Sequence, residues 1–216
     1  MRLMEYLRAR ENPYSPRVHA NGFIQVDITP SVRLHVWGDD RIPRQRVPTP
    51  IHDHAFQFTS RVLLGALTQR TYVLHPSGAA YQPHQARVRR GEDTMLVPEG
   101  VPVQLAVHGS VVLSAGDVAD AVYSMAPWEI HETIPLGPAV SVIVKRGLTI
   151  SQGGVSPTVF VPVGLAPSYE FDRHAVLSPR DMWGIVDDVV RFEVEAVATG
   201  LLWALWANTV SSQVLR

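Results

Sequence analysis

The sequence predicts a mainly β chain, an antiparallel sandwich or barrel with a short helix before it and helical segments after it. The first observation is a series of short runs rich in β-branched and aromatic residues, separated by clusters of Gly, Pro and Asp. The second is that apolar residues on either side of this series recur at helical spacing. The third is size: 216 residues, 46% hydrophobic and 18% charged, are enough for one good-sized folded domain.

Residues 1–20 are expected to form an N-terminal helix and arm. Leu3, Met4 and Leu7 lie among charged residues at a spacing that suits one short helix, and Pro13 would end it.

Residues 21–146 are expected to form the β domain. Gly65 separates two of its runs and predicts a tight hairpin or a corner there. The expected strands are residues 22–28, 32–37, 58–64, 67–74, 94–97, 103–107, 111–114, 121–125 and 139–145.

Residues 147–216 are expected to form a loop-rich connector with one strand at 158–161, followed by helices. Ser178 is a candidate N-cap, with Pro179 at the first helical position, and apolar residues recur at helical spacing up to Val197. A second apolar piece follows at 201–210. This region should pack on the β domain or on a neighbouring subunit, which predicts a homodimer.

Composition excludes several function classes. Nineteen Lys and Arg residues against twenty Asp and Glu give a net charge of −1, so the chain has no broad positive field and nucleic acid is not an expected partner. Because cysteine is absent, disulfides, thiolate zinc sites and cysteine nucleophiles are excluded, and any metal must be held by other side chains.

Neither end of the chain suggests a membrane. The N-terminus has no apolar run of the secretory kind, and the apolar stretch at 196–207 is about half the length that a bilayer requires. A cytoplasmic location without a membrane partner is therefore expected.

Histidines form the most informative pattern. His52 and His54 are two residues apart, so on a strand they would share a face and could both reach one divalent ion at about 2.0–2.1 Å. The same pair could also be two exposed histidines in a loop. A third histidine, His131, follows a Pro-containing turn at Pro127 in a second strand-turn-strand unit.

This pattern resembles the two motifs of the cupin superfamily. The first motif has His-x-His, a Glu about four residues on and a Gly about seven after that; the second has a Pro-containing turn and a His. The residues that match are His52, His54, Gly65, Pro127 and His131. Phe58 stands at the Glu position and Trp128 at a Gly of the second motif. The resemblance covers about residues 20–146 and implies the double-stranded β-helix, or jelly-roll barrel, of cupins.

The ligand pattern is most similar to three-histidine cupins such as cysteine and other thiol dioxygenases, whose first motif also begins His-Asp-His. The resemblance implies a divalent metal ion held by His52, His54 and His131, with Fe(II) favoured and Zn, Ni or Mn as alternatives. Gln57 lies beside the Glu position and could supply an oxygen ligand, although its strand parity opposes that of His54.

Other polar residues are candidates for roles beside the metal. Tyr72 and Tyr123 could hydrogen-bond a substrate inside the barrel, or simply pack. Arg61 and Arg70 could clamp a carboxylate, or face solvent. His35 is expected to line the barrel or lie in its core.

Two acidic residues lie close to the histidines in sequence. Asp53 alternates away from the metal face and is expected in a turn or as an acceptor for a histidine N–H. Glu129 could be a ligand or a general base, although an exposed loop residue is the simpler interpretation.

Three functions fit these patterns. The first is an iron-dependent dioxygenase acting on a small polar molecule. The second is a metal-dependent isomerase or decarboxylase. The third is a non-catalytic binding or structural module, which the missing Glu favours.

Overall fold

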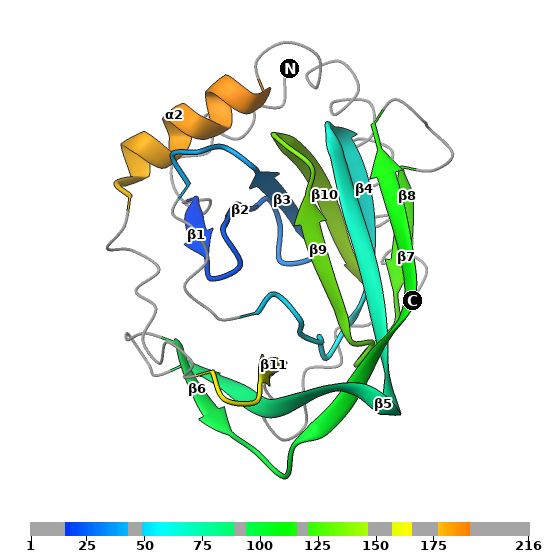
Figure 1. Cartoon of the computed structure of the whole chain (residues 1–216). Coiled ribbons are helices and arrows are strands. Elements are labelled where there is room, and N and C mark those ends of the chain that lie inside the picture. Colours follow the sequence, from blue (N-terminus) through cyan, green and yellow to red (C-terminus); the bar gives the residue numbers. More distant parts are fainter. Residues whose placement is uncertain are drawn as a thin grey trace, which may run out of the picture.

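The computed structural model describes residues 16–42, 49–88, 94–115, 121–146, 157–165 and 177–190. In these ranges two antiparallel sheets face each other and one helix packs on the outside (Figure 1). The predicted mainly β class is confirmed, as a sandwich of two antiparallel sheets. The described strands form two sheets and do not close into the barrel that the sequence predicted.

The first sheet joins segments that are far apart in the sequence. Strand β10 lies between β3 and β4, with Val142 opposite Leu34 on one side and opposite Arg61 on the other. In spatial order the sheet contains β1 (Arg17–His19), β2 (Phe23–Asp27), β3 (Val32–Trp37), β10 (Ala139–Arg146), β4 (Gln57–Leu64) and β8 (Val122–Met125).

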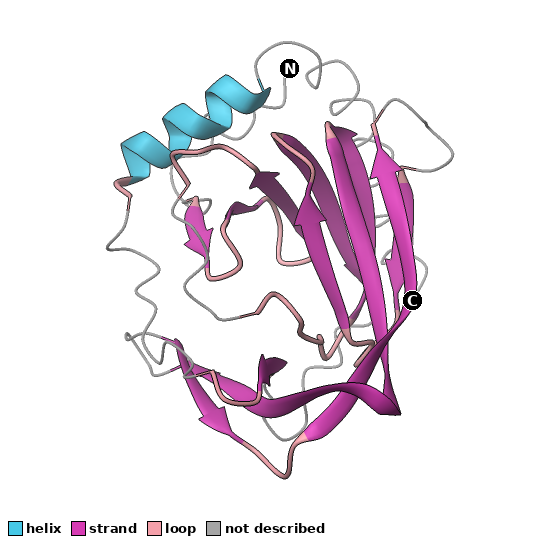
Figure 2. Ribbon diagram, in the orientation of Figure 1, coloured by secondary structure: helices cyan, strands magenta, loops and turns pink. Residues whose placement is uncertain are grey.

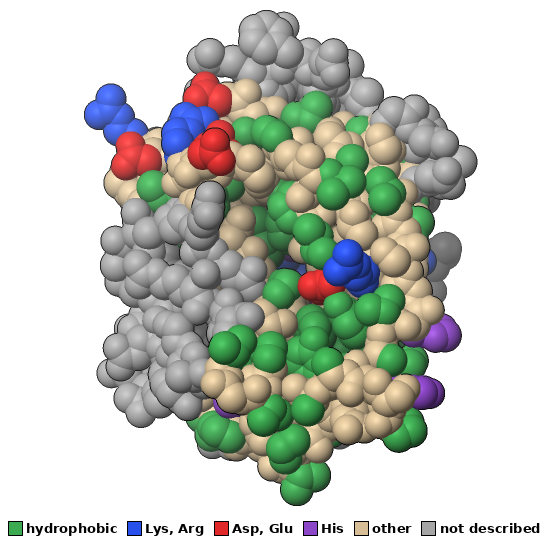
Figure 3. Space-filling view, in the orientation of Figure 1, with side chains coloured by type: hydrophobic (Ala, Val, Ile, Leu, Met, Phe, Trp, Pro, Cys, Tyr) green, Lys and Arg blue, Asp and Glu red, His purple; other side chains and the backbone are tan. Residues whose placement is uncertain are grey.

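The second sheet is organised around one long strand, β5 (Ala66–Val88), which curves along the lower edge of the molecule in Figure 2. Its four partners are β6 (Thr94–Pro98), β7 (Val103–Ser114), β9 (His131–Pro135) and β11 (Thr158–Pro162). Hydrophobic side chains reach the surface over the lower part of the molecule (Figure 3). Leu74 of β5 is 66% exposed, and no described helix covers that side chain.

The expected strands at 67–74, 103–107 and 111–114 are shorter than those observed. The last two form the single strand β7, and β5 continues to Val88 through Pro76 and Gly78, which resemble turn residues in the sequence. A register shift between Leu74 and Ala79 accommodates them, because a bulge lets a strand bend without ending. The short strand β1 was not predicted.

Gly65 forms the corner at which the chain passes from β4 in the first sheet to β5 in the second, as the sequence predicted. Its φ is +68°, and a Cβ atom built there would lie 2.2 Å from the carbonyl oxygen of Pro138. Only glycine combines this backbone conformation with so close an approach.

Gly65→Ala should lower the free energy of unfolding by about 2–5 kcal/mol, because a left-handed L-residue costs about 1–2 kcal/mol and overpacking adds about 1–3 kcal/mol. Gly100→Ala is the matched control, since Gly100 has φ +66° but a Cβ atom built there would have no neighbour within 4 Å. We expect that control to lose only about 1–2 kcal/mol in urea unfolding. Equal losses in the two variants would contradict a steric role for Gly65.

Helix α2 (Pro179–Val190) covers the outer face of the first sheet. Its start is as predicted: the Ser178 hydroxyl accepts a hydrogen bond from the Asp181 amide at 3.1 Å and donates one to the Asp181 carboxylate at 2.6 Å. The largest core cluster includes Leu34, Val36, Val140, Val142, Met182, Ile185 and Val186. This part of the C-terminal region therefore packs on the β domain.

Two of the expected helical segments, at 1–12 and 201–210, lie outside the described residues. Among the described residues, no helix combines the length and the apolar character that a membrane span requires.

Candidate metal centre

The three predicted histidines meet between the two sheets. Their candidate ligand atoms all lie within 4.8 Å of one another, and the Nε2 atoms of His52 and His54 are 3.1 Å apart. Two nitrogens that each lie about 2.0–2.1 Å from one shared ion are separated by about 3 Å. The cluster therefore has the dimensions of a site for one divalent ion, although His52 and His54 are far from His131 in the sequence.

Backbone pairing brings the two segments together. The amides and carbonyls of His52 and His131 exchange two hydrogen bonds of 2.9 Å, forming an isolated antiparallel bridge. His52 also bridges to Val159 of β11. The His-x-His segment is thus extended but is not a full strand, and its alternation still places His52 and His54 together.

Asp53 points away from the histidines, as its parity predicts. Its carboxylate accepts a 2.7 Å hydrogen bond from the Thr158 amide, and its own amide donates to the Thr158 carbonyl at 3.0 Å. The expectation that Asp53 accepts from a histidine is not met in this structure. Asp53 instead ties the His-x-His segment to β11, and burial raises the pKa of its carboxyl.

Backbone carbonyls fix the orientation of two of the rings. The Nδ1 atom of His131 lies 2.9 Å from the Glu129 carbonyl oxygen, and that of His52 lies 2.6 Å from the Pro50 carbonyl oxygen. Because a carbonyl oxygen only accepts, Nδ1 carries the hydrogen in both rings. The Nε2 lone pair then remains for a metal, which is the tautomer that metal-binding histidines usually require.

Burial keeps the cluster uncharged. It is the largest cause that lowers the pKa of His131 to about 3, with the neighbouring His52 adding to the effect. Burial also lowers the pKa of His52, and together with the charges of His52 and His131 it holds the pKa of His54 well below its usual value. All three rings are therefore neutral at neutral pH, the form in which imidazole binds metal.

Aromatic rings pack against this cluster. Phe58, at the position of the cupin Glu, is 2% exposed, and its ring centroid lies 5.6 Å from that of His54 and 5.8 Å from that of His131. Phe56 stacks on His54 at 4.9 Å. Gln57, the other candidate ligand, is exposed at the start of β4 and does not line the cavity.

The two candidate tyrosines lie in different places. Tyr123 lines the same cavity as the histidines, with its ring 5.9 Å from that of Phe58. Burial raises the pKa of its phenol, although Ser60 and Thr133 offset part of that change. Tyr123 is therefore a neutral hydrogen-bonding group inside the cavity.

Tyr72 is not brought to the cluster. Its hydroxyl donates to the Glu132 carboxylate at 2.5 Å, and Arg70 pairs with the same oxygen at 3.1 Å. Glu132 follows His131 on β9 and therefore points to the opposite face of the sheet. Arg61 is half-buried on β4, and neither it nor Arg70 lines the cavity.

Glu129 also lies outside the cluster. Its carboxylate accepts a 2.9 Å hydrogen bond from the Ala126 amide and so closes the turn before β9, in which Trp128 has a φ of +64°. Glu129 contributes to the site through its backbone carbonyl, which anchors His131.

The cavity has a volume of about 40 Å³, enough for only a few water molecules. Part of its wall was not predicted as a binding surface: Gln25 of β2 and Arg33 of β3 line it together with the expected His35. The alternation of side chains along β3 could have indicated these lining residues, because Arg33, His35 and Trp37 face the cavity while Leu34 and Val36 pack toward α2.

No family model matches the chain, and no curated protein matches it. The solved structures that are similar to it include two dioxygenases. One is hydroquinone 1,2-dioxygenase PnpCD in complex with Cd²⁺ and 4-hydroxybenzonitrile, at 16% identity and a TM-score of 0.31, with 68% of this chain and 74% of that chain covered. Another is hydroquinone 1,2-dioxygenase from Sphingomonas sp. TTNP3 with 4-hydroxybenzoate bound, at 11% identity and a TM-score of 0.31, with 67% and 72% covered. Similarities at this level assign neither a substrate nor a metal to this chain.

Proposed function

We propose that the chain is a metal-binding cupin in which His52, His54 and His131 hold one divalent ion, and that it acts as an iron-dependent dioxygenase on a small polar molecule. The observation that carries the proposal is the convergence of three neutral imidazoles, with ligand atoms within 4.8 Å, from two distant segments. Fe(II) is the favoured ion, with Zn, Ni and Mn as alternatives.

The chemistry of the donor set fits such an ion. Two of the rings have Nδ1 anchored on a backbone carbonyl, and the cavity contains no carboxylate among its described lining residues. Three neutral ligands would leave the full double charge on the ion, and a ferrous ion held by His52, His54 and His131 would supply the redox chemistry of a dioxygenase.

The other lining residues would prepare the substrate. Phe56, Phe58 and Ile143 provide an apolar wall that excludes water and strengthens the polar contacts inside. Tyr123 offers a phenol that stays protonated and could donate a hydrogen bond to a substrate oxygen. The small cavity favours a small molecule.

Metal content and oxygen consumption test this proposal. We expect protein purified without added metal to contain about one ion per chain by elemental analysis, and the Fe(II)-loaded protein to consume oxygen with a member of a panel of small acids and thiols. Turnover with Zn or Mn under anaerobic conditions would instead indicate an isomerase or decarboxylase. A stoichiometric ion without any turnover would indicate a binding module, and failure to hold any of these ions would contradict the metal site itself.

The remaining sequence-based expectations stay proposals. They are the division of the chain into three regions with boundaries after residues 20 and 146, a small-molecule partner in place of nucleic acid or membrane, a cytoplasmic location and a homodimer. Light scattering coupled to gel filtration tests the homodimer directly, and a monomeric mass would remove it.

A further inference from the structure

The cavity wall formed by β2 and β3 contains a buried histidine whose ring nitrogens find no hydrogen-bond partner in the described part of the chain. His35 is 6% exposed and lines the cavity, and among the described residues neither Nδ1 nor Nε2 has a partner. Its ring instead packs against Phe23 at 4.4 Å and against Trp37 at 5.7 Å. Burying an imidazole without partners is unfavourable, so a bound molecule that supplies them is the simplest explanation.

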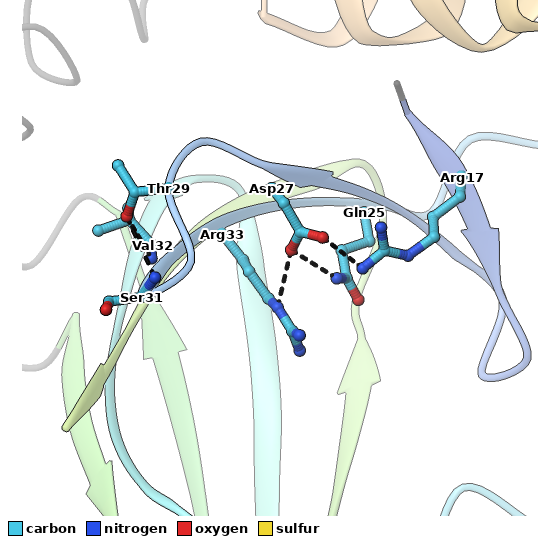
Figure 4. A network of polar contacts seen from close by, with 7 residues as sticks. All are labelled: Arg17, Gln25, Asp27, Thr29, Ser31, Val32 and Arg33. Carbon is cyan, nitrogen blue, oxygen red and sulfur yellow. Dashed lines mark hydrogen bonds and ion pairs between the residues drawn. The ribbon is translucent and has the colours of Figure 1, made fainter. Parts of the chain in front are cut away.

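Positive charge is concentrated beside this histidine. The Asp27 carboxylate pairs with two guanidinium groups, with Arg17 at 2.5 Å and with Nε of Arg33 at 2.8 Å (Figure 4). Lys145 lies close enough that, after burial, the charge of Arg33 is the next cause lowering its pKa to about 8. Two guanidinium groups therefore pair with one carboxylate, and Lys145 lies within electrostatic range of them, so positive charge exceeds negative charge in this region.

Arg33 brings part of this positive charge to the cavity wall. Arg33 is the one formally charged side chain among the described lining residues, and its charge also lowers the pKa of His54. It pairs with Asp27 through Nε, and its terminal nitrogens point away from that carboxylate in Figure 4. These terminal nitrogens can donate to a second planar acceptor.

We propose that Arg33 and His35 form an anion subsite, which binds the carboxylate of a small organic acid whose other end lies at the three-histidine cluster. The role of the cluster in this arrangement rests on the proposed function, whereas the anion subsite does not require the metal. A guanidinium fork matches the two oxygens of a carboxylate, and a neutral imidazole N–H can donate to one of them. The small cavity with its aromatic walls suits a carboxylate better than the larger phosphate.

Acetate and its neutral analogue acetamide test this subsite. Both would be titrated into chelator-treated protein and into metal-loaded protein at constant ionic strength, with binding measured by calorimetry. We expect the metal-free protein to bind acetate at least about tenfold more tightly than acetamide or inorganic phosphate. Equal binding of acetate and acetamide would overturn the proposal, and preferential binding of phosphate would overturn the choice of a carboxylate.

Variants of Arg33 and His35 test whether these two residues are the ones that bind acetate. Arg33→Met should weaken acetate binding at least about tenfold, while Arg33→Lys should restore part of it. Arg61→Met is the matched control, because Arg61 does not line the cavity, and it should bind acetate like the wild type. His35→Phe should weaken acetate binding without lowering the melting temperature of the ligand-free protein, a combination that a purely structural histidine would not produce.

The two proposals can fail independently. Acetate binding that depends on Arg33 in a protein that retains no metal would contradict the metal site and support the subsite. A protein that holds one ion but binds acetate equally well with and without Arg33 would contradict the subsite alone.

Discussion

His131→Ala should abolish stoichiometric metal binding. Three imidazoles share the ion in the proposed site, and structural zinc sites contribute about 10–16 kcal/mol in total, so losing one ligand should weaken binding by about 10²–10⁴-fold. The cavity left by the imidazole would be lined by the rings of His52, His54 and Phe58, none of which can take its place as a third donor. Elemental analysis after dialysis, followed by competition with a chromophoric chelator, measures both the loss of the ion and the change in affinity.

His84→Ala provides a closely matched control. His84 is 3% exposed and His131 is 2% exposed, and each has Nδ1 2.9 Å from the backbone carbonyl of the residue two positions earlier. His84 lies outside the three-histidine group. Both variants remove a buried, anchored imidazole, but only His131→Ala should lose the metal. Equal metal content in the two variants would show that the cluster does not hold the ion.

Local sequence patterns predicted most of the strands because their signals are themselves local. The residues of β3 and β10 alternate or run continuously as apolar segments between turn residues, and Gly65 marks the corner between the sheets. The length of β5 was not predictable in this way. Its continuation past Pro76 depends on partners in β6, β7 and β11, which are distant in the sequence.

The residues of the candidate site differ in the same way, because some depend on local sequence patterns and others on distant contacts. The pair His52 and His54 was predicted from its spacing, and His131 was added to it through the resemblance to the second cupin motif, since both are patterns of a few neighbouring residues. Arg33 and His35 belong to the cavity only because β3 turns that face toward β9, and this orientation depends on the helix that covers Leu34 and Val36 on the other face. Tyr72 shows the converse, since its strand β5 pairs with β9, which carries His131, but the Tyr72 hydroxyl hydrogen-bonds to Glu132 on the opposite face.

The stability of the metal-free protein should fall steeply as the pH drops below about 6.5. Burial is the main cause that lowers the pKa of both His35 and His131 to about 3, assisted by the charge of Arg33 at His35 and by His52 at His131. In the unfolded chain both rings take up a proton near pH 6.5, whereas in the folded chain they remain neutral until about pH 3. The unfolded state therefore binds more protons throughout this window, and the free energy of unfolding decreases as the pH falls.

Each of these two histidines should lower the free energy of unfolding by roughly 1 kcal/mol for each unit by which the pH falls between 6.5 and 3. Urea unfolding of chelator-treated protein at pH 7, 6 and 5 measures this slope. His35→Phe removes one titrating group and should reduce the slope by about one proton. His35→Gln should reduce it equally, because glutamine keeps a polar side chain but cannot titrate. If both variants kept the wild-type slope, the His35 ring would take up its proton equally well in the folded and the unfolded chain. The ring would then not be desolvated, which would contradict the buried environment on which the anion subsite depends. A slope that falls in both variants, with His35→Phe at least as stable as the wild type at pH 7, would identify an unpaired polar ring maintained for binding and not for folding.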